Sequence, residues 1–347
     1  MAGTSGPETA PAPSAGAARS PKLQPTPPNS NRLRRLAEEL AENGLPQDPD
    51  TRRRAILLQE VDRCLRPAVH ERRAPSYGVI IDPGAAPDDW ELGTQLDIAR
   101  IPVEKAPGTA PWRFADGLSS WLVRRVAGRG EGGGDEWLLF DRPAGSERDL
   151  VVLVQSLDAT IVQRHPSGAV RIVGHFGLLR WEGVTWHFEP PLRKWLEAVA
   201  APPFVGDVAV VKALLDFAVH DLGALGIGAL LVYRPVDGPS DRFEERLPLP
   251  PPLQIRKASH LAPLRHVLSQ VDGAAIFDLT GALRRLGVRL VPSTTAEESV
   301  VAFGGTRHIS GLRYSFDDPS ATIVAVSEDG PVTVARTGSV VARPSSR

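Results

Sequence analysis

Three features that mark secreted, membrane or nucleic-acid-binding proteins are scarce in this sequence. Cys64 is the single cysteine in 347 residues, so an intramolecular disulfide and a multi-cysteine zinc site are both excluded. The net charge of −1 gives no overall attraction to nucleic acid or anionic lipid. No run reaches the roughly 18 apolar residues of a membrane span, and the N-terminus lacks the apolar region of a signal peptide. We therefore expect a cytoplasmic protein without membrane or nucleic-acid partners.

The length of 347 residues suits about two domains, at roughly 150 residues each. Residues 1–31 contain seven prolines together with many Ala, Ser, Thr and Gly, and this composition cannot build a core. We predict a disordered tail over 1–31, one domain over 32–200 and a second domain over 206–343. The fold class is α/β, with an α+β, strand-rich first domain and a mixed-sheet second domain with flanking helices.

The first domain is predicted to open with two helices, one capped by Asn31 and one starting after Asp50. Residues 77–188 are predicted to be mostly strands, with a turn at 165–168 that pairs two of them as a hairpin. The segments expected here are a helix over Trp112–Val126, a helix after Pro190, and strands over Tyr77–Asp82, Trp137–Phe140, Leu150–Val154, Ala159–Gln163, Ala169–Val173 and Val184–Phe188. We interpret this domain as a sensor or regulatory module.

Three histidines, His165, His175 and His187, lie in this strand-rich region. Three histidines can bind zinc. Their spacing is not that of metal ligands, so ordinary surface or half-buried histidines are the favoured interpretation.

The second domain is predicted as helix, strand, helix, strand, strand, helix, strand, strand. Its apolar runs and turns indicate helices from Asp207, over His260–Gln270 and over Gly305–Tyr314, with Thr294–Ala302 as a loop. The strands are expected over Gly226–Tyr233, Ala274–Phe277, Ala282–Leu290, Ser320–Ser327 and Val332–Ala335. The Asp-Gly turn at 329–330 joins the last two strands as a hairpin.

Two short stretches in this domain have the chemistry of a nucleotide site. Asp272 at a strand start and Glu328 at a strand end are oxygen ligands suited to Mg²⁺ or Mn²⁺. Gly273 would allow close approach of a nucleotide to the backbone. The second stretch, Gly305-Thr306-Arg307-His308, places backbone N–H groups, a hydroxyl and two basic side chains at a helix start, where phosphate binds.

Asp272-Gly273-Ala274, Gly305-Thr306-Arg307-His308 and Ser327-Glu328 together resemble motifs of the diadenylate cyclase domain family, of the type found at the N-terminus of DisA. The resemblance covers roughly the last 140 residues. It implies metal-dependent condensation of two ATP into cyclic di-AMP and pyrophosphate, in a homodimer or higher oligomer. It also implies catalytic roles for Asp272, Arg307 and His308, ATP contacts from Gly273, Ala274, Gly305, Thr306, Arg307, His308 and Ser327, and metal binding by Asp272 and Glu328.

The sequence departs from this family at three places. Ile309 replaces a phosphate-binding arginine, and Arg313, one helical turn further on, is the candidate replacement. The adenine-seating segment of the family is not recognisable in the proline-rich stretch 247–253, and Asp329 stands in place of a glutamate. Two alternatives to an active cyclase therefore stay open: a catalytically degenerate protein that binds ATP or cyclic di-AMP, and a structural protein with coincidental motifs.

Overall fold

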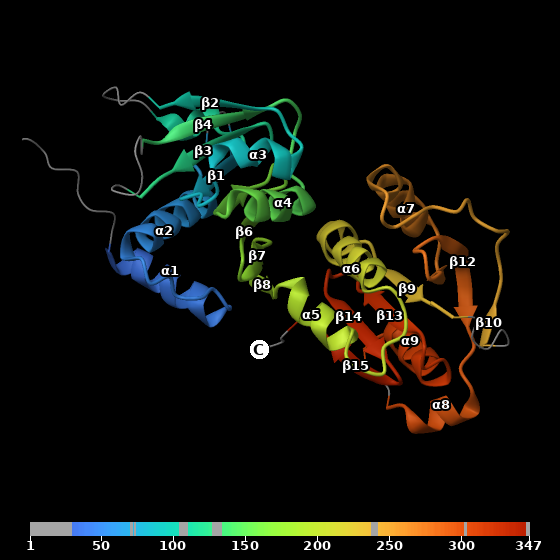
Figure 1. Cartoon of the computed structure of the whole chain (residues 1–347). Coiled ribbons are helices and arrows are strands. Elements are labelled where there is room, and N and C mark those ends of the chain that lie inside the picture. The colour runs from blue at the N-terminus through green and yellow to red at the C-terminus, as the bar shows by residue number, and fades with distance from the viewer. Residues whose placement is uncertain are drawn as a thin grey trace, which may run out of the picture.

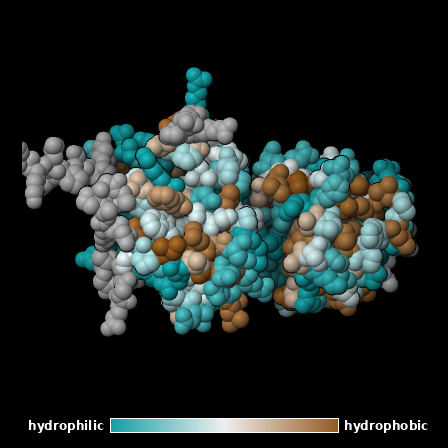
Figure 2. All heavy atoms as spheres, turned by 90° about the horizontal axis from the view of Figure 1, so that it is seen from above, coloured by the Kyte–Doolittle hydropathy of each residue, from teal (hydrophilic) through white to brown (hydrophobic). Residues whose placement is uncertain are grey.

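The computed structural model describes residues 30–69, 72, 74–103, 110–126, 134–236, 242–301 and 304–344. The predicted disorder of the tail therefore falls, for residues 1–29, outside the described residues. The described residues form two mixed β-sheets with helices around them, so a mixed α/β fold is confirmed (Figure 1). In the space-filling view of Figure 2 the molecule has two lobes joined by a narrower waist.

Residues Ser30 to Val199 contain the first sheet, the helices that cover it and, at the end, a helix over Leu192–Val199 that packs in the core of the second sheet instead. Among the described residues the sheet has eight strands in the order β2-β4-β3-β1-β5-β6-β7-β8, and β1 and β3 are its parallel pair. The elements are α1 (Ser30–Glu42), α2 (Thr51–Leu65), β1 (Tyr77–Ile81), α3 (Pro87–Thr94), β2 (Ile98–Pro102), the 3₁₀ turn η1 (Pro111–Phe114), β3 (Ser120–Arg124), β4 (Glu136–Phe140), α4 (Glu147–Leu157), β5 (Thr160–Arg164), β6 (Val170–Gly174), β7 (Gly177–Trp181), β8 (Trp186–Glu189) and α5 (Leu192–Val199).

Both faces of this sheet are covered, because successive side chains of a strand point to opposite faces. Val79 and Ile81 pack with α1 and α2, whereas Ile80, between them, packs with α3 and α4. A strand buried on both faces is continuously apolar, and this explains why the run over 77–81 is so easily recognised in the sequence.

The second sheet contains, among the described residues, seven strands in the order β10-β12-β11-β9-β13-β14-β15. Strands β9 and β11 are parallel, and β13 is antiparallel to β9. The elements are α6 (Val208–Phe217), the π-helical turn η2 (Ala218–Leu222), the 3₁₀ turn η3 (Gly223–Leu225), β9 (Ala229–Tyr233), β10 (Phe243–Glu244), α7 (Ala258–Gln270), β11 (Ala274–Phe277), β12 (Leu283–Leu290), α8 (Thr294–Ser299), α9 (Thr306–Asp317), β13 (Thr322–Val326), β14 (Val332–Arg336) and β15 (Ser339–Ala342).

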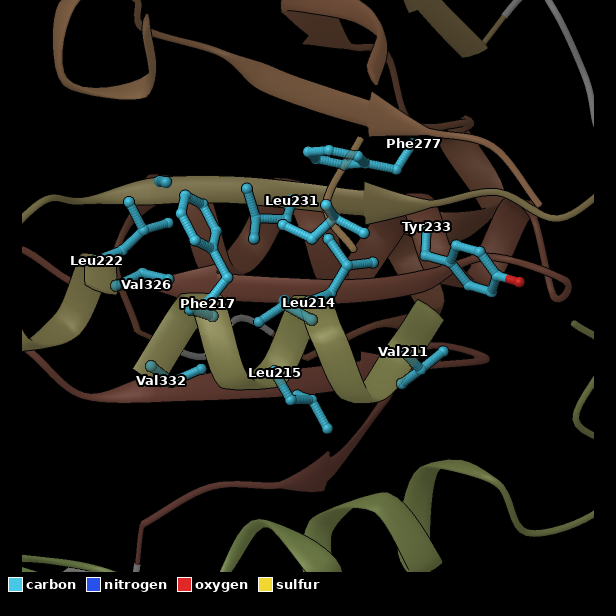
Figure 3. Packing of buried hydrophobic residues seen from close by; sticks show 14 of the residues in the cluster. Val211, Leu214, Leu215, Phe217, Leu222, Leu231, Tyr233, Phe277, Val326 and Val332 are labelled. Carbon is cyan, nitrogen blue, oxygen red and sulfur yellow. The ribbon is translucent and has the colours of Figure 1, made fainter. Parts of the chain in front are cut away.

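Helix α6 supplies much of the core on one face of this sheet. Its buried side chains Leu214 and Phe217 pack with Leu231 of β9 and Val326 of β13, as Figure 3 shows. On the opposite face, Leu312 of α9 packs with Leu230 of β9 and Ile323 of β13, which alternate along their strands with the residues that face α6. Each helix and strand predicted in this region is present and in the predicted order, and β10, α8 and β15 are additions that the sequence analysis missed.

Three segment predictions were wrong, and each error lies where a polar residue fixes the local backbone. Residues 112–126 are not a helix: Asp116 accepts hydrogen bonds from the amides of Leu118 and Ser120, which makes a turn before β3. Residues 150–154 are helical, because Ser146 and Asp149 form a reciprocal capping box that starts α4. Residues 294–299 are helical rather than a loop, because Ser293 caps α8.

The remaining differences are smaller. Helix α1 already includes Ser30, so Asn31 lies inside it rather than at its cap. The helix α3 and the edge strand β2 were not predicted, since neither has a long apolar pattern. The helix start after Asp50 and the hairpin between β5 and β6 are confirmed, and Asp50 is the N-cap of α2.

Candidate functional site

The strand directions of the second sheet bring distant motif residues to one edge. Asp272 precedes β11, and Gly228 precedes β9, which runs parallel to β11. Glu328 follows β13, and because β13 is antiparallel to β9, its carboxyl end lies beside the start of β9, with Val326 paired to Ala229. The start of α9 reaches the same edge through Arg307.

Arg307 joins the two carboxylates at this edge. Its Nη2 donates to Asp272 Oδ1 at 3.2 Å and its Nη1 donates to Glu328 Oε1 at 2.9 Å. The Asp272 and Glu328 side chains are 98% and 70% exposed, so both can reach a ligand from solvent. The hydrogen bond to Glu328, and then that to Asp272, raises the pKa of Arg307, which therefore stays a cation.

Gly228 completes this arrangement and was missed by the sequence analysis. A Cβ there would collide with Arg307 Nη1 and would lie 2.8 Å from Glu328 Cγ. Only glycine therefore leaves room for the pair of Arg307 and Glu328. The sequence analysis included Gly226 and Gly228 in a strand, and the need for glycine at position 228 is visible only in the tertiary structure.

Gly273 has a structural role that the sequence analysis did not foresee, and its contact with a nucleotide stays a prediction. Its φ is +107°, and a Cβ there would lie 2.7 Å from the Gly287 carbonyl carbon and 2.9 Å from Val288 O. Its glycine is thus required by the close approach of β12. Ala274 is fully buried within β11 and faces the core shared with α9.

The start of α9 has the features of an anion site. Gly305 is the N-cap without a side-chain cap, and Gly305 and Thr306 are exposed. The helix dipole adds partial positive charge at this end. Burial and the neighbouring Arg307 lower the pKa of His308, which favours its neutral form near pH 7. Ser327 N donates to Pro331 O at 3.0 Å, which closes the turn that carries Glu328.

Arg313 is not brought together with this group. Its Nη2 contacts Glu297 O at 3.5 Å and its Nη1 lies 3.8 Å from Glu297 Oε1, so the guanidinium is directed toward α8. Ile309 thus leaves the group without a second guanidinium: among the described contacts of Asp272 and Glu328, Arg307 is the one cation.

The donor set suits a hard divalent cation that keeps several other ligands. Among the described residues no group of three or more His, Cys, Asp or Glu could hold a metal ion. Mg²⁺, however, is commonly bound through one or two carboxylates plus substrate phosphates and water. Asp272 and Glu328, both bound to one guanidinium, fit that pattern. Of the three histidines, His165 contacts Ser167 and His175 contacts Asp158, and His187 is exposed in β8.

Comparison with known proteins gives one family match. Residues 34–189 match the family described as "Probable sensor domain DACNK". No curated protein matches the chain. Within the described part of the chain, no helix has the length and apolar character needed to cross a membrane.

Several solved structures have local similarity to the chain, among them the two that follow. One is a hypothetical membrane spanning protein from Bacillus cereus, at 20% identity and a TM-score of 0.32, covering 44% of this chain and 69% of that one. The other is a double mutant of DacA from Staphylococcus aureus, at 22% identity and a TM-score of 0.28, covering 40% and 87%. Both TM-scores lie below 0.5, and neither likeness assigns a fold or an activity to this chain.

Proposed function

We propose that the chain is a diadenylate cyclase regulated by its N-terminal module. The observation that carries this proposal is the convergence of Asp272, Arg307 and Glu328, from three separate segments, at one edge of the second sheet. The match of residues 34–189 to a probable sensor domain agrees with a regulated enzyme.

The reaction joins two ATP molecules in two equivalent steps. In each step the ribose 3′-oxygen of one ATP attacks the α-phosphorus of the other, a P–O bond forms, and the bond to pyrophosphate breaks. Asp272 accepts the proton of the attacking hydroxyl, and Arg307 with the amide groups at the start of α9 binds the triphosphate. Mg²⁺ or Mn²⁺ held by Asp272 and Glu328 would supply charge neutralisation at the phosphates. Because each site holds one ATP, two copies of the domain must face each other, and a homodimer or higher oligomer follows.

Regulation has a physical route through the contact between α4 and η2. Glu147 of α4 binds His220 Nδ1 at 3.1 Å, and Arg148 lies 2.7 Å from Asp221. The segment after η2 reaches the turn that carries Glu328, since a Cβ at Gly226 would lie 3.1 Å from Glu328 O. A shift of α4 is therefore transmitted to one of the two proposed metal ligands.

The test is metal-dependent formation of cyclic di-AMP from ATP, followed by mass spectrometry. The purified chain with Mn²⁺ is expected to form the product, Asp272→Asn to reduce its rate at least a hundredfold, and Glu298→Gln to leave it unchanged. Glu298 is an exposed carboxylate on α8 outside the proposed site. Absence of product at high protein concentration, with ATP bound, would reject the cyclase.

A second candidate function is a nucleotide sensor that binds ATP or cyclic di-AMP without turnover. The placement of Arg313 against Glu297, away from Arg307, favours it because the triphosphate would lack a second guanidinium. In that case ATP raises the melting temperature, as expected for a ligand that binds the folded state, with no product formed. Arg313→Ala should then leave ATP binding intact.

A further inference from the structure

Three cavities of about 970, 710 and 840 Å³ are lined mainly or wholly by the N-terminal module, and none of these three includes Asp272, Arg307 or Glu328. Of the three, the cavity of about 840 Å³ has the lining with the largest excess of positive over negative side chains. It lies between the start of α1, the end of α2, the start of β1, η1 and the end of β5. Its volume is in the range of small-molecule sites.

The lining of this cavity carries an excess of positive charge. Five arginines contribute to it, and Asp62 is the carboxylate among its lining residues. Asp62 pairs with Arg32 and, at 3.9 Å, with Arg66. The remaining three lining arginines are Arg63, Arg113 and Arg164.

Glu60 compensates only one of these three. The buried Glu60 accepts from Arg63 Nε at 3.0 Å. Arg164 donates to the backbone carbonyls of Cys64 and Gly168, so it covers the negative end of α2 without being neutralised. Neither Arg113 nor Arg164 has a carboxylate partner in the part of the chain that the structure describes.

An indole ring provides the apolar complement. Trp112 is 38% exposed, and the Arg63 guanidinium lies 4.2 Å from its ring centroid. A guanidinium held flat on an aromatic ring keeps its N–H edge available for an oxyanion. Val69 and Leu33 add further apolar wall, and Val69 is 66% exposed.

We infer that this cavity binds a small anionic ligand with a flat aromatic body, in which a phosphate or carboxylate meets the arginines and the ring packs against Trp112 and Arg63. A ligand with both parts contacts both sides of the cavity. Its anionic group meets the guanidinium groups of Arg113 and Arg164, which have no carboxylate partner among the described residues, and its ring meets the half-exposed indole. This assignment gives the N-terminal module its own ligand site, and it does not depend on the activity of the second sheet's site.

The test uses the full chain and isothermal titration with 1-naphthyl phosphate. One-to-one binding is expected, with at least tenfold weaker binding of 1-naphthol and of inorganic phosphate, which each lack one half of the ligand. Titration with 1-naphthoate distinguishes a phosphate site from a carboxylate site. Arg113→Gln and Trp112→Leu should each weaken 1-naphthyl phosphate at least tenfold.

Two controls make the result decisive. Arg193→Gln removes an arginine whose side chain is 84% exposed and lies outside the cavity, so it should bind like the unmodified chain. Asp272→Asn should also bind 1-naphthyl phosphate normally, which separates this site from the proposed ATP site.

The inference is overturned if 1-naphthyl phosphate does not bind below 10 mM (roughly −3 kcal/mol by the affinity relation), if 1-naphthol binds equally well, or if Arg113→Gln behaves like Arg193→Gln. Arg113 is exposed, so its replacement leaves the core intact even if Trp112→Leu does not fold.

Discussion

The buried carboxylate of Glu147 should be a main determinant of the stability of the N-terminal module. Its side chain is fully buried, Arg180 binds both of its oxygens at 2.7 and 2.8 Å, and His220 Nδ1 lies 3.1 Å from one of them. Glu147→Gln would strand the charge of Arg180, whose side chain is 6% exposed, and of Arg171, at 7%. Removing one partner of a buried ion pair costs about 3–5 kcal/mol.

The assay is urea unfolding at pH 7.5, followed by tryptophan fluorescence. Six of the seven tryptophans lie between positions 90 and 186 in the N-terminal module, whereas Trp195 packs in the core of the second sheet, so most of the signal comes from the N-terminal module. Glu182→Gln is the matched control, because Glu182 pairs with the same Arg180 at 3.8 Å but is 51% exposed, and such pairs contribute about 0–1 kcal/mol. Equal unfolding free energies for the Glu147 and Glu182 variants would refute the reasoning.

The acid dependence of the same group gives an independent check. Burial raises the pKa of Glu147, but the hydrogen bond from His220 and the charge of Arg180 outweigh burial, and the net pKa is lowered from 4.5. A lowered carboxyl pKa stabilises the fold above the unfolded value, and this stability is lost as pH falls through the folded value. The difference between the unmodified chain and Glu147→Gln should therefore shrink below about pH 4.5.

Three further predictions concern single residues. Burial raises the pKa of Glu189 to about 7, so its ionisation opposes folding as pH rises from 4.5 to 7. At pH 8, Glu189→Gln should therefore unfold at a higher urea concentration than the unmodified chain, with a free energy of unfolding larger by up to about 3 kcal/mol. At pH 4 the difference should be much smaller. Gly228→Ala should displace Arg307 and reduce ATP turnover at least tenfold while the urea midpoint of the N-terminal module stays unchanged. Burial raises the pKa of the Cys64 thiol, so Ellman's reagent should react with it only after unfolding.

Gly228→Ala has a matched control variant, and a contradicting outcome can be stated for each of the three predictions. Gly134→Ala adds a methyl group where nothing lies within 4 Å, so it should not change turnover, and an active Gly228→Ala would contradict the proposed close packing at Arg307. A pH-independent effect of Glu189→Gln would contradict the raised pKa. Rapid reaction of Cys64 in the folded chain would show that α2 opens at the position of this fully buried side chain.

The elements that could be predicted from the sequence are those whose own residues fix them. Strand β9 is apolar along its whole length, and α6 combines a helical apolar pattern with a cap at Asp207. The errors fall where short polar interactions override the apolar pattern. In α4, the pattern of Leu150 to Val154 suits a strand equally well, and the capping box at Ser146 decides for the helix.

The same distinction applies to the candidate site. The residue types of Asp272, Arg307 and Glu328 and their motifs are visible in the sequence, and so is the substitution at Ile309. Their distances are not, since Arg307 is 35 residues from Asp272 and 21 from Glu328. The direction of Arg313 toward Glu297 could not be predicted either, because it depends on α8, which the sequence analysis took for a loop.

The sequence by itself therefore determined the chemistry available to this protein: its apolar strands, its helix caps and the carboxylate, arginine and glycine residues of the motifs. Only the tertiary structure decided which of these groups meet. The antiparallel direction of β13 beside the parallel pair β9 and β11 brings Glu328 to the edge that holds Asp272. Likewise, the arginines of the N-terminal cavity come from four separate segments of the chain. Contacts between such distant segments form only when the sheets and helices pack, so no local sequence pattern predicts them.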